Sequence, residues 1–69
     1  MQVKLMFLGT YDFSPKDKPE KSYKIYQFVD LNSLQVIVGT DLNVKLKEEE
    51  YYNCLLELKG NKLRVKSVQ

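Results

Sequence analysis

Lysines and aromatic residues interleave between residues 16 and 28, and these are the side chains of the chain best suited to binding chemistry. The stretch contains the lysines Lys16, Lys18, Lys21 and Lys24 and the rings Tyr23, Tyr26 and Phe28. Ammonium groups neutralise phosphates, and each base that stacks on a ring contributes roughly 1–3 kcal/mol, whichever base it is. The pattern predicts a site for a flexible single-stranded polynucleotide, DNA or RNA, with Tyr11 as a further candidate ring. Binding there should be weakly sequence-specific and steeply salt-dependent.

Positive charge also collects near the C-terminus. Four cations follow residue 57 with no acid among them: Lys59, Lys62, Arg64 and Lys66. The net charge is only +2, from 11 basic and 9 acidic residues, so the placement of charge matters more than its sum. Separation of the signs would give one flank of a small domain a positive field, and Arg64 joins the predicted site for this reason. The alternative is that these are ordinary solvated charges.

Catalytic groups are scarce in the chain. It has no histidine, one cysteine (Cys54) and no glycine-rich phosphate loop. The commonest general base and the usual zinc ligands are therefore missing, and no nucleophile has a base to activate it. We expect no enzymatic activity, no cofactor, no metal and no small-molecule substrate, and we expect Cys54 only to fill space.

Nothing in the sequence predicts a membrane segment or a secretion signal. No run of about 18 apolar residues occurs, and residues 1–10 lack the apolar length and cleavage pattern of a signal peptide. A single cysteine also excludes an intramolecular disulfide. The expected location is the cytoplasm, without membrane contact.

The length of 69 residues predicts one domain, residues 1–69, since so short a chain cannot divide into two cores. Alternation and turn chemistry predict strands at residues 2–11, 23–31, 34–38, 51–59 and 62–68. A long loop at 12–22 and a tight turn at 32–33 join the first three strands. Residues 40–50 should form a short helix or an irregular link in which Leu42 and Leu46 touch the core.

The alternation also predicts which side chains face the core. The inward sets are Val3, Leu5 and Phe7 in the first strand, Tyr23, Ile25, Gln27 and Val29 in the second, Tyr52, Cys54, Leu56 and Leu58 in the fourth, and Leu63 and Val65 in the fifth. With these residues facing the core, Lys24, Tyr26 and Phe28 are expected on the solvent-exposed surface. The alternative is that Phe28 is packed, because a bulge shifts the pattern by one residue. Gly9 is placed where a barrel strand would coil or bulge.

Five strands with a connection inserted between the third and fourth predict an all-β fold, a small OB-fold barrel. In such barrels the face of strands two and three, together with the first loop, forms the usual ligand groove. The alternative is an SH3-like barrel, which also has five strands and a long early loop.

Four short segments carry a likeness to a known family. They are Lys18-Pro19 and residues 28–31 (FVDL), 36–38 (VIV) and 62–65 (KLRV). In this order they resemble the gene V type single-stranded DNA-binding proteins of filamentous phages, over about residues 18–65. The resemblance implies a dimeric OB-fold barrel that coats single-stranded DNA cooperatively, in the replication of a phage or mobile element. It also implies that the first loop acts as a DNA-binding wing.

Three positions depart from that family. The turn at residues 59–62 is much shorter than the family's loop at this place, which contributes to its dimer and DNA surface. Glu20 and Gln35 stand where the family has tyrosines. These departures bear on the dimer geometry and on which rings stack.

A second function is compatible with the same residues. Tyr11, Phe13, Tyr23 and Tyr26 could form an aromatic surface for a peptide or another subunit, as in a protein-interaction module. A peptide site built on rings should depend little on ionic strength, whereas a polynucleotide site should depend on it strongly. In either case we expect a homodimer, because association covers strand edges that a small sheet leaves unpaired.

Overall fold

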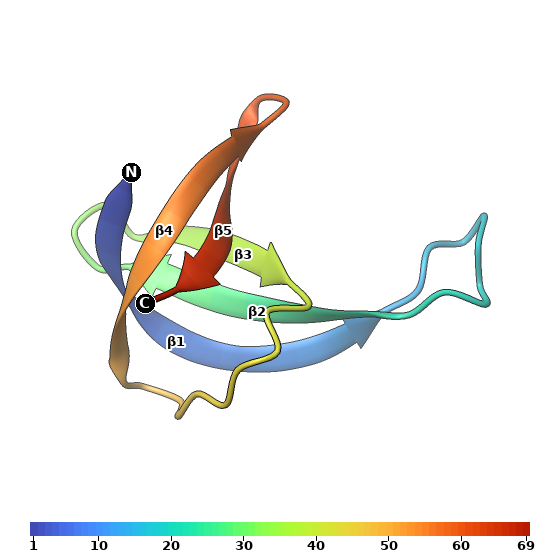
Figure 1. Ribbon diagram of the computed structural model, residues 1–69, viewed down its shortest axis with the longest axis horizontal. Coiled ribbons are helices and arrows are strands. Elements are labelled where there is room, and N and C mark those ends of the chain that lie inside the picture. The colour runs from blue at the N-terminus through green and yellow to red at the C-terminus, as the bar shows by residue number, and fades with distance from the viewer.

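The computed structural model describes residues 1–69 and contains five strands and no helix (Figure 1). The strands are β1 (Gln2–Phe13), β2 (Tyr23–Asp30), β3 (Gln35–Thr40), β4 (Tyr51–Lys59) and β5 (Lys62–Val68). They close into a barrel in the order β1-β2-β3-β5-β4. The predicted all-β, five-stranded barrel is confirmed.

The pairing of the strands separates the two barrel plans considered from the sequence. All neighbours are antiparallel except β3 and β5, which are parallel. β1 pairs with β4 through its first half and with β2 through its second half, and it does not meet the last strand. This connectivity favours the OB-fold plan over the SH3-like plan, in which the first and last strands are neighbours.

A bulge at Gly9 bends β1 so that one strand can serve two neighbours. The register with β2 shifts between Phe7 and Gly9, and Gly9 has φ +132°, a backbone conformation that side chains rarely allow. A Cβ at this position would lie 2.7 Å from Oε1 of Glu48. The predicted bulge is confirmed, and only glycine fits it without strain.

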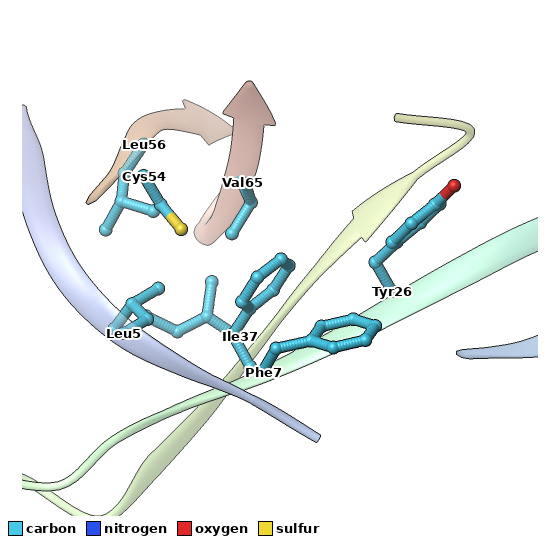
Figure 2. Packing of buried hydrophobic residues seen from close by; sticks show 8 residues of the cluster. Leu5, Phe7, Tyr26, Ile37, Cys54, Leu56 and Val65 are labelled. Carbon is cyan, nitrogen blue, oxygen red and sulfur yellow. The ribbon is translucent and has the colours of Figure 1, made fainter. Parts of the chain in front are cut away.

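The core is a single cluster inside the barrel (Figure 2). Its eight buried residues are Leu5, Phe7, Tyr26, Phe28, Ile37, Cys54, Leu56 and Val65. Within it the Phe7 ring packs against two other rings, with ring centroids 5.3 Å from Phe28 and 6.1 Å from Tyr26. Burial of each large side chain contributes about 1.5–3 kcal/mol, so the three rings are a major part of the stability.

The predicted orientation of β2 is wrong. Phe28 is 0% exposed and Tyr26 is 5% exposed, and the set that contains Ile25 and Gln27 faces outward. The physical reason is twofold: two rings bury more apolar area than the aliphatic set, and an inward Gln27 would lose the hydration of its amide. Tyr26 keeps its hydroxyl at the barrel end, where the hydroxyl donates a hydrogen bond to the Val44 carbonyl at 3.4 Å.

Other boundaries differ from prediction for local reasons. β1 runs on to Phe13, and Leu34 lies in the β2–β3 turn with φ +58° rather than in β3. Leu58 is 71% exposed, because it lies near the tip of the β4–β5 hairpin, which projects beyond the barrel (Figure 1). The link before β4 is irregular, without a helix, and Leu42 and Leu46 pack against the core as predicted.

Backbone hydrogen bonds attach this link to β1. The Phe7 N–H donates to the Glu50 carbonyl at 2.9 Å, and the Glu49 N–H donates to the Phe7 carbonyl at 2.8 Å. The link therefore closes the end of the barrel next to the bulge. None of the chain forms a helix of the length and apolarity needed to cross a membrane.

Candidate nucleic-acid interface

A groove of about 660 Å³ lies between the ribbon of β1 and β2 and the hairpin of β4 and β5. All five strands contribute to its lining. Its floor is formed by Ile25, Val38 and Thr40, which are adjacent because Ile25 pairs with Thr40 across β2 and β3. The outer face of these two strands, next to the first loop and the β4–β5 turn, is where OB-fold barrels bind oligonucleotides and oligosaccharides.

Three aromatic rings line one side of the groove. Phe13 lies directly opposite Tyr23 across β1 and β2, and Tyr11 lies two residues before Phe13 on the same face. Opposed residues have Cβ atoms about 4.5–5.5 Å apart, and residues two apart on a strand are about 7 Å apart. Tyr11 is 47% exposed and Phe13 is 50% exposed, so their ring faces are available to a ligand.

The bulge at Gly9 decides that these rings face outward. Before the bulge, the odd-numbered residues Leu5 and Phe7 point into the barrel. After it, the odd-numbered residues Tyr11 and Phe13 pair with the outward residues of β2. A regular strand would have continued the inward set through residues 11 and 13, because successive side chains alternate between faces. One extra residue therefore moves two rings from the core side to the groove.

Three cations line the opposite side. Lys59 and Lys62 flank the tight β4–β5 turn, where Gly60 adopts the left-handed conformation with φ +66°. Arg64 follows on β5 and pairs in parallel with Val38 on the groove floor. No aspartate or glutamate is among the lining residues, so the positive field of the groove is not neutralised from within its walls.

The Arg64 side chain is partly buried. Its Nε atom is buried and has no hydrogen-bond partner, although the residue as a whole is partly exposed. A buried donor without an acceptor costs about 1–3 kcal/mol, and a partly desolvated cation attracts an anion more strongly than a hydrated one. An anion held by the terminal nitrogens of Arg64 would offset part of that cost. Arg64 is thus a partly desolvated cation in the same groove as the rings.

The structure divides the predicted site residues into separate groups. Tyr23 and Arg64 lie together in the groove with Tyr11. Phe28 is in the core and presents no ring face to a ligand. The predicted stacking surface on Tyr26 and Phe28 is therefore replaced by rings on the outer face of the same ribbon.

Lys24 and Tyr26 lie at a different place, a pocket of about 470 Å³ at the end of the barrel closed by the link. Lys24 is fixed through its backbone, since its N–H donates to Asp41 Oδ1 at 2.9 Å and its carbonyl accepts from the Asp41 N–H at 2.9 Å. Glu48 also lines this pocket. Lys24 is therefore on the opposite face of β2 from the groove.

The remaining predicted lysines lie in the loop between β1 and β2. Lys16, Lys18 and Lys21 are exposed, and two turns order the loop, with Lys18 N–H donating to Pro15 O at 3.2 Å and Lys21 N–H to Lys18 O at 3.0 Å. The loop extends away from the barrel at the end of the ribbon that carries the rings (Figure 1). A polynucleotide that leaves the groove past Phe13 and Tyr23 would meet these lysines.

Sequence reasoning did not place Phe13, Lys59 and Lys62 in the polynucleotide site. Phe13 was considered only for a peptide surface, and the two lysines only as part of a charged segment. The signal that could have found Phe13 is the bulge at Gly9, because counting faces through it puts residues 11 and 13 outward with residue 23. The lysines required knowledge of where the β4–β5 hairpin projects.

The only thiol of the chain lies in the core. Cys54 is fully buried among core residues, and burial raises the pKa of its thiol from 9.0 to about 11. The nucleophilic thiolate form is thus scarce at neutral pH. No cluster of three or more carboxylate and thiol groups is arranged to hold a metal ion.

Comparisons of the chain with protein-family models, with curated proteins and with solved structures found no match in any of the three. The resemblance to gene V type proteins therefore stays a prediction from the sequence.

Proposed function

We propose that the protein binds single-stranded nucleic acid in the groove between the β1–β2 ribbon and the β4–β5 hairpin. The observation that carries the proposal is the composition of the groove: three rings face three cations, and no acid lies among its lining residues. Unpaired polynucleotide offers both complements, base faces for the rings and phosphates for the cations. A duplex hides its base faces in its own stack, so it should bind more weakly.

The rings and the cations have separate tasks in this proposal. Tyr11, Phe13 and Tyr23 stack on bases of any sequence, each stack being worth roughly 1–3 kcal/mol. Lys59, Lys62 and Arg64 hold the backbone, and Lys16, Lys18 and Lys21 of the first loop extend its path. Recognition by stacking and charge carries little sequence information, because every base has a ring face and every nucleotide a phosphate.

Two parts of the proposal rest on the sequence alone. A role in the replication of a phage or mobile element follows only from the gene V resemblance. A cytoplasmic location without catalytic activity follows only from the residue inventory described above. The groove supports single-stranded nucleic acid as the class of ligand. It does not bear on a role in replication, on the location of the protein or on catalytic activity.

The test is fluorescence anisotropy with a labelled oligo-dT short enough to fill one groove and with a matched duplex, each at two salt concentrations. We expect the single strand to bind more tightly and to be released by salt. Phe13→Ala and Tyr23→Ala should each weaken binding, whereas Tyr51→Ala, an exposed ring outside the groove, should not. Equal binding of strand and duplex, or no binding at low salt, would refute the proposal.

The same assay separates the competing function. A peptide or protein site made from these rings would leave oligo-dT unbound and would be insensitive to salt. The three cations in the groove are the observation that favours the polynucleotide over the peptide.

A further inference from the structure

The pocket at the end of the barrel closed by the link is large enough for a small ligand. Its volume of about 470 Å³ falls within the range of about 300–1,000 Å³ that small-molecule sites occupy. Lys24 and Tyr26 line this pocket, whereas Tyr23 and Ile25 line the groove. Since successive residues of a strand point to opposite faces, the β1–β2 ribbon separates the two sites. A ligand in this pocket would therefore not compete for the rings of the groove.

The link forms one wall of the pocket and is anchored at both ends. At one end, the Asp41 N–H donates to the Lys24 carbonyl at 2.9 Å. At the other end, the Glu49 N–H donates to the Phe7 carbonyl at 2.8 Å. Asp41 and Glu49 have φ +48° and +66°, a left-handed conformation that non-glycine residues adopt infrequently and that recurs at ligand sites. The backbone of the link therefore holds this wall in a fixed position.

Three charged side chains line the pocket without partners. They belong to Lys24, Lys45 and Glu48, and none of their side-chain atoms takes part in a hydrogen bond of the fold. Two more acids lie close to Lys24. Asp12 is opposite it across β1 and β2 but outside the lining, and Asp41 already accepts its backbone N–H. The pocket itself thus presents two ammonium groups and one carboxylate.

The carboxylate lies at some distance from Lys24. Glu48 lies against the bulge, because its Oε1 would be 2.7 Å from a Cβ at Gly9. Gly9 pairs with Gln27, which is three residues from Lys24, so the two charges are about 10 Å apart along β2 at a rise of about 3.3 Å per residue. An α-amino acid is too short to reach both, because its opposite charges are separated by only two bonds. A nucleotide has a suitable length from its phosphate to the far edge of its base.

Hydroxyl groups lie between the two ends. Thr10 and Tyr26 are directly opposed across β1 and β2, at a level between Gly9 and Lys24. The Tyr26 hydroxyl points away from the core cluster (Figure 2) and donates to the Val44 carbonyl, which leaves its lone pairs available to a ligand. These groups are suited to the hydroxyls of a sugar.

We propose that this pocket binds a nucleotide whose base is cytosine or adenine, with the phosphate held by Lys24 and Lys45 and the exocyclic amino group of the base donating to Glu48. Carboxylates accept hydrogen bonds from such amino groups, whereas thymine and uracil carry a carbonyl oxygen at the same position. Two ammonium groups suit the charge of a phosphate. The ligand is either a free nucleoside monophosphate or the phosphorylated end of a strand. The sequence by itself predicts no small-molecule substrate, so this site rests on the pocket alone.

The test is a titration of the isotope-labelled full chain with CMP and with UMP, followed by the NMR shifts of the backbone amides. We expect CMP to shift the amides of Gly9, Thr10 and Lys45 and to bind about tenfold more tightly than UMP. Lys45→Ala should weaken CMP binding about tenfold. Lys47→Ala is the matched control, because Lys47 is an exposed link lysine outside the lining. Glu48→Gln should abolish the preference for CMP.

Three results would overturn the proposal. They are equal binding of CMP and UMP, equal loss in the two lysine variants, and the same amide shifts with inorganic phosphate as with CMP. Oligo-dC with and without a terminal phosphate distinguishes the two sources of the ligand. If only the phosphorylated form shifts the pocket amides, the ligand includes the strand end, and if neither does, it is the free nucleotide.

This proposal can fail independently of the function proposed for the groove. Thymine has no exocyclic amino group, so oligo-dT should fill the groove and leave the amides of Gly9 and Thr10 unshifted. CMP should then still bind to the chain saturated with oligo-dT.

Discussion

Replacing Lys59 and Lys62 with alanine removes two of the three cations of the groove and should flatten the salt dependence of oligonucleotide binding. For single strands, the logarithm of the binding constant falls with the logarithm of salt concentration with a slope of about −0.7 per phosphate contacted. Three groove cations predict a slope of about −2, and Arg64 alone predicts about −0.7. The substitution should therefore reduce the steepness by about 1.4.

This difference is large enough to measure. Between 50 and 200 mM salt, the affinity of the unmodified chain should fall about 20-fold, and that of Lys59→Ala/Lys62→Ala only about 3-fold. The assay is fluorescence anisotropy of a short labelled oligo-dT at four or more salt concentrations. Lys4→Ala/Lys47→Ala is the matched control, because it removes the same charge from exposed positions outside the groove.

Two results would refute the reasoning. If the groove variant keeps the slope of the unmodified chain, the phosphates do not lie along the β4–β5 hairpin. If the control variant flattens the slope equally, only net charge matters. A slope near −4 in the unmodified chain would indicate that the three loop lysines also contact phosphates. The slope should then return to about −2 when Lys16, Lys18 and Lys21 are replaced with alanine.

Three further predictions concern the rings, the bulge and the thiol. Phe13→Ala should lose about 1–3 kcal/mol of binding to oligo-dT by anisotropy with little change in stability, whereas Phe28→Ala should lose about 3–5 kcal/mol of unfolding free energy in urea. Gly9→Ala should destabilise the fold by about 1–3 kcal/mol in urea, because φ is +132° and the added Cβ meets Glu48. Burial raises the pKa of Cys54 from 9.0 to about 11, so its contribution to stability is full below pH 9 and should be lost as the pH rises toward 11. Urea unfolding across this pH range, compared with Cys54→Ala, isolates that contribution from the other titrating groups.

Each of these three predictions would be contradicted by one specific result. Equal loss of stability in the two phenylalanine variants would mean that Phe13 is structural and not a free ring. A Gly9→Ala variant as stable as the unmodified chain would remove the argument that the bulge requires glycine. Parallel pH profiles for the chain and for Cys54→Ala would show that folding does not raise the pKa of the thiol.

Much of the fold could be predicted because it depends on local patterns. Alternation placed Leu5, Phe7 and Val65 in the core, and the glycine at residue 60 marked the last hairpin. For residues 40–50 the sequence predicts either a short helix or an irregular link. These residues include weak helix formers, and their apolar positions follow no clear period. The order and spacing of these elements were enough to predict five strands in a barrel.

The orientation of β2 could not be predicted in the same way. Alternation has a period of two residues and gives two sets, but it does not say which set is buried when both contain large apolar residues. In β2 one set holds Ile25 and Val29 and the other holds Tyr26 and Phe28. The choice was made by the interior of the closed barrel, where both rings pack against Phe7.

The kinds of groups available follow directly from the residues: lysines and aromatic rings, no histidine, and a glycine where β1 bends. Which of these groups meet depends on how the strands pair and close. The bulge changed the face on which Tyr11 and Phe13 emerge, and barrel closure brought the β4–β5 hairpin opposite them. Neither event is visible in a local pattern, because each depends on contacts between strands that are far apart in the chain.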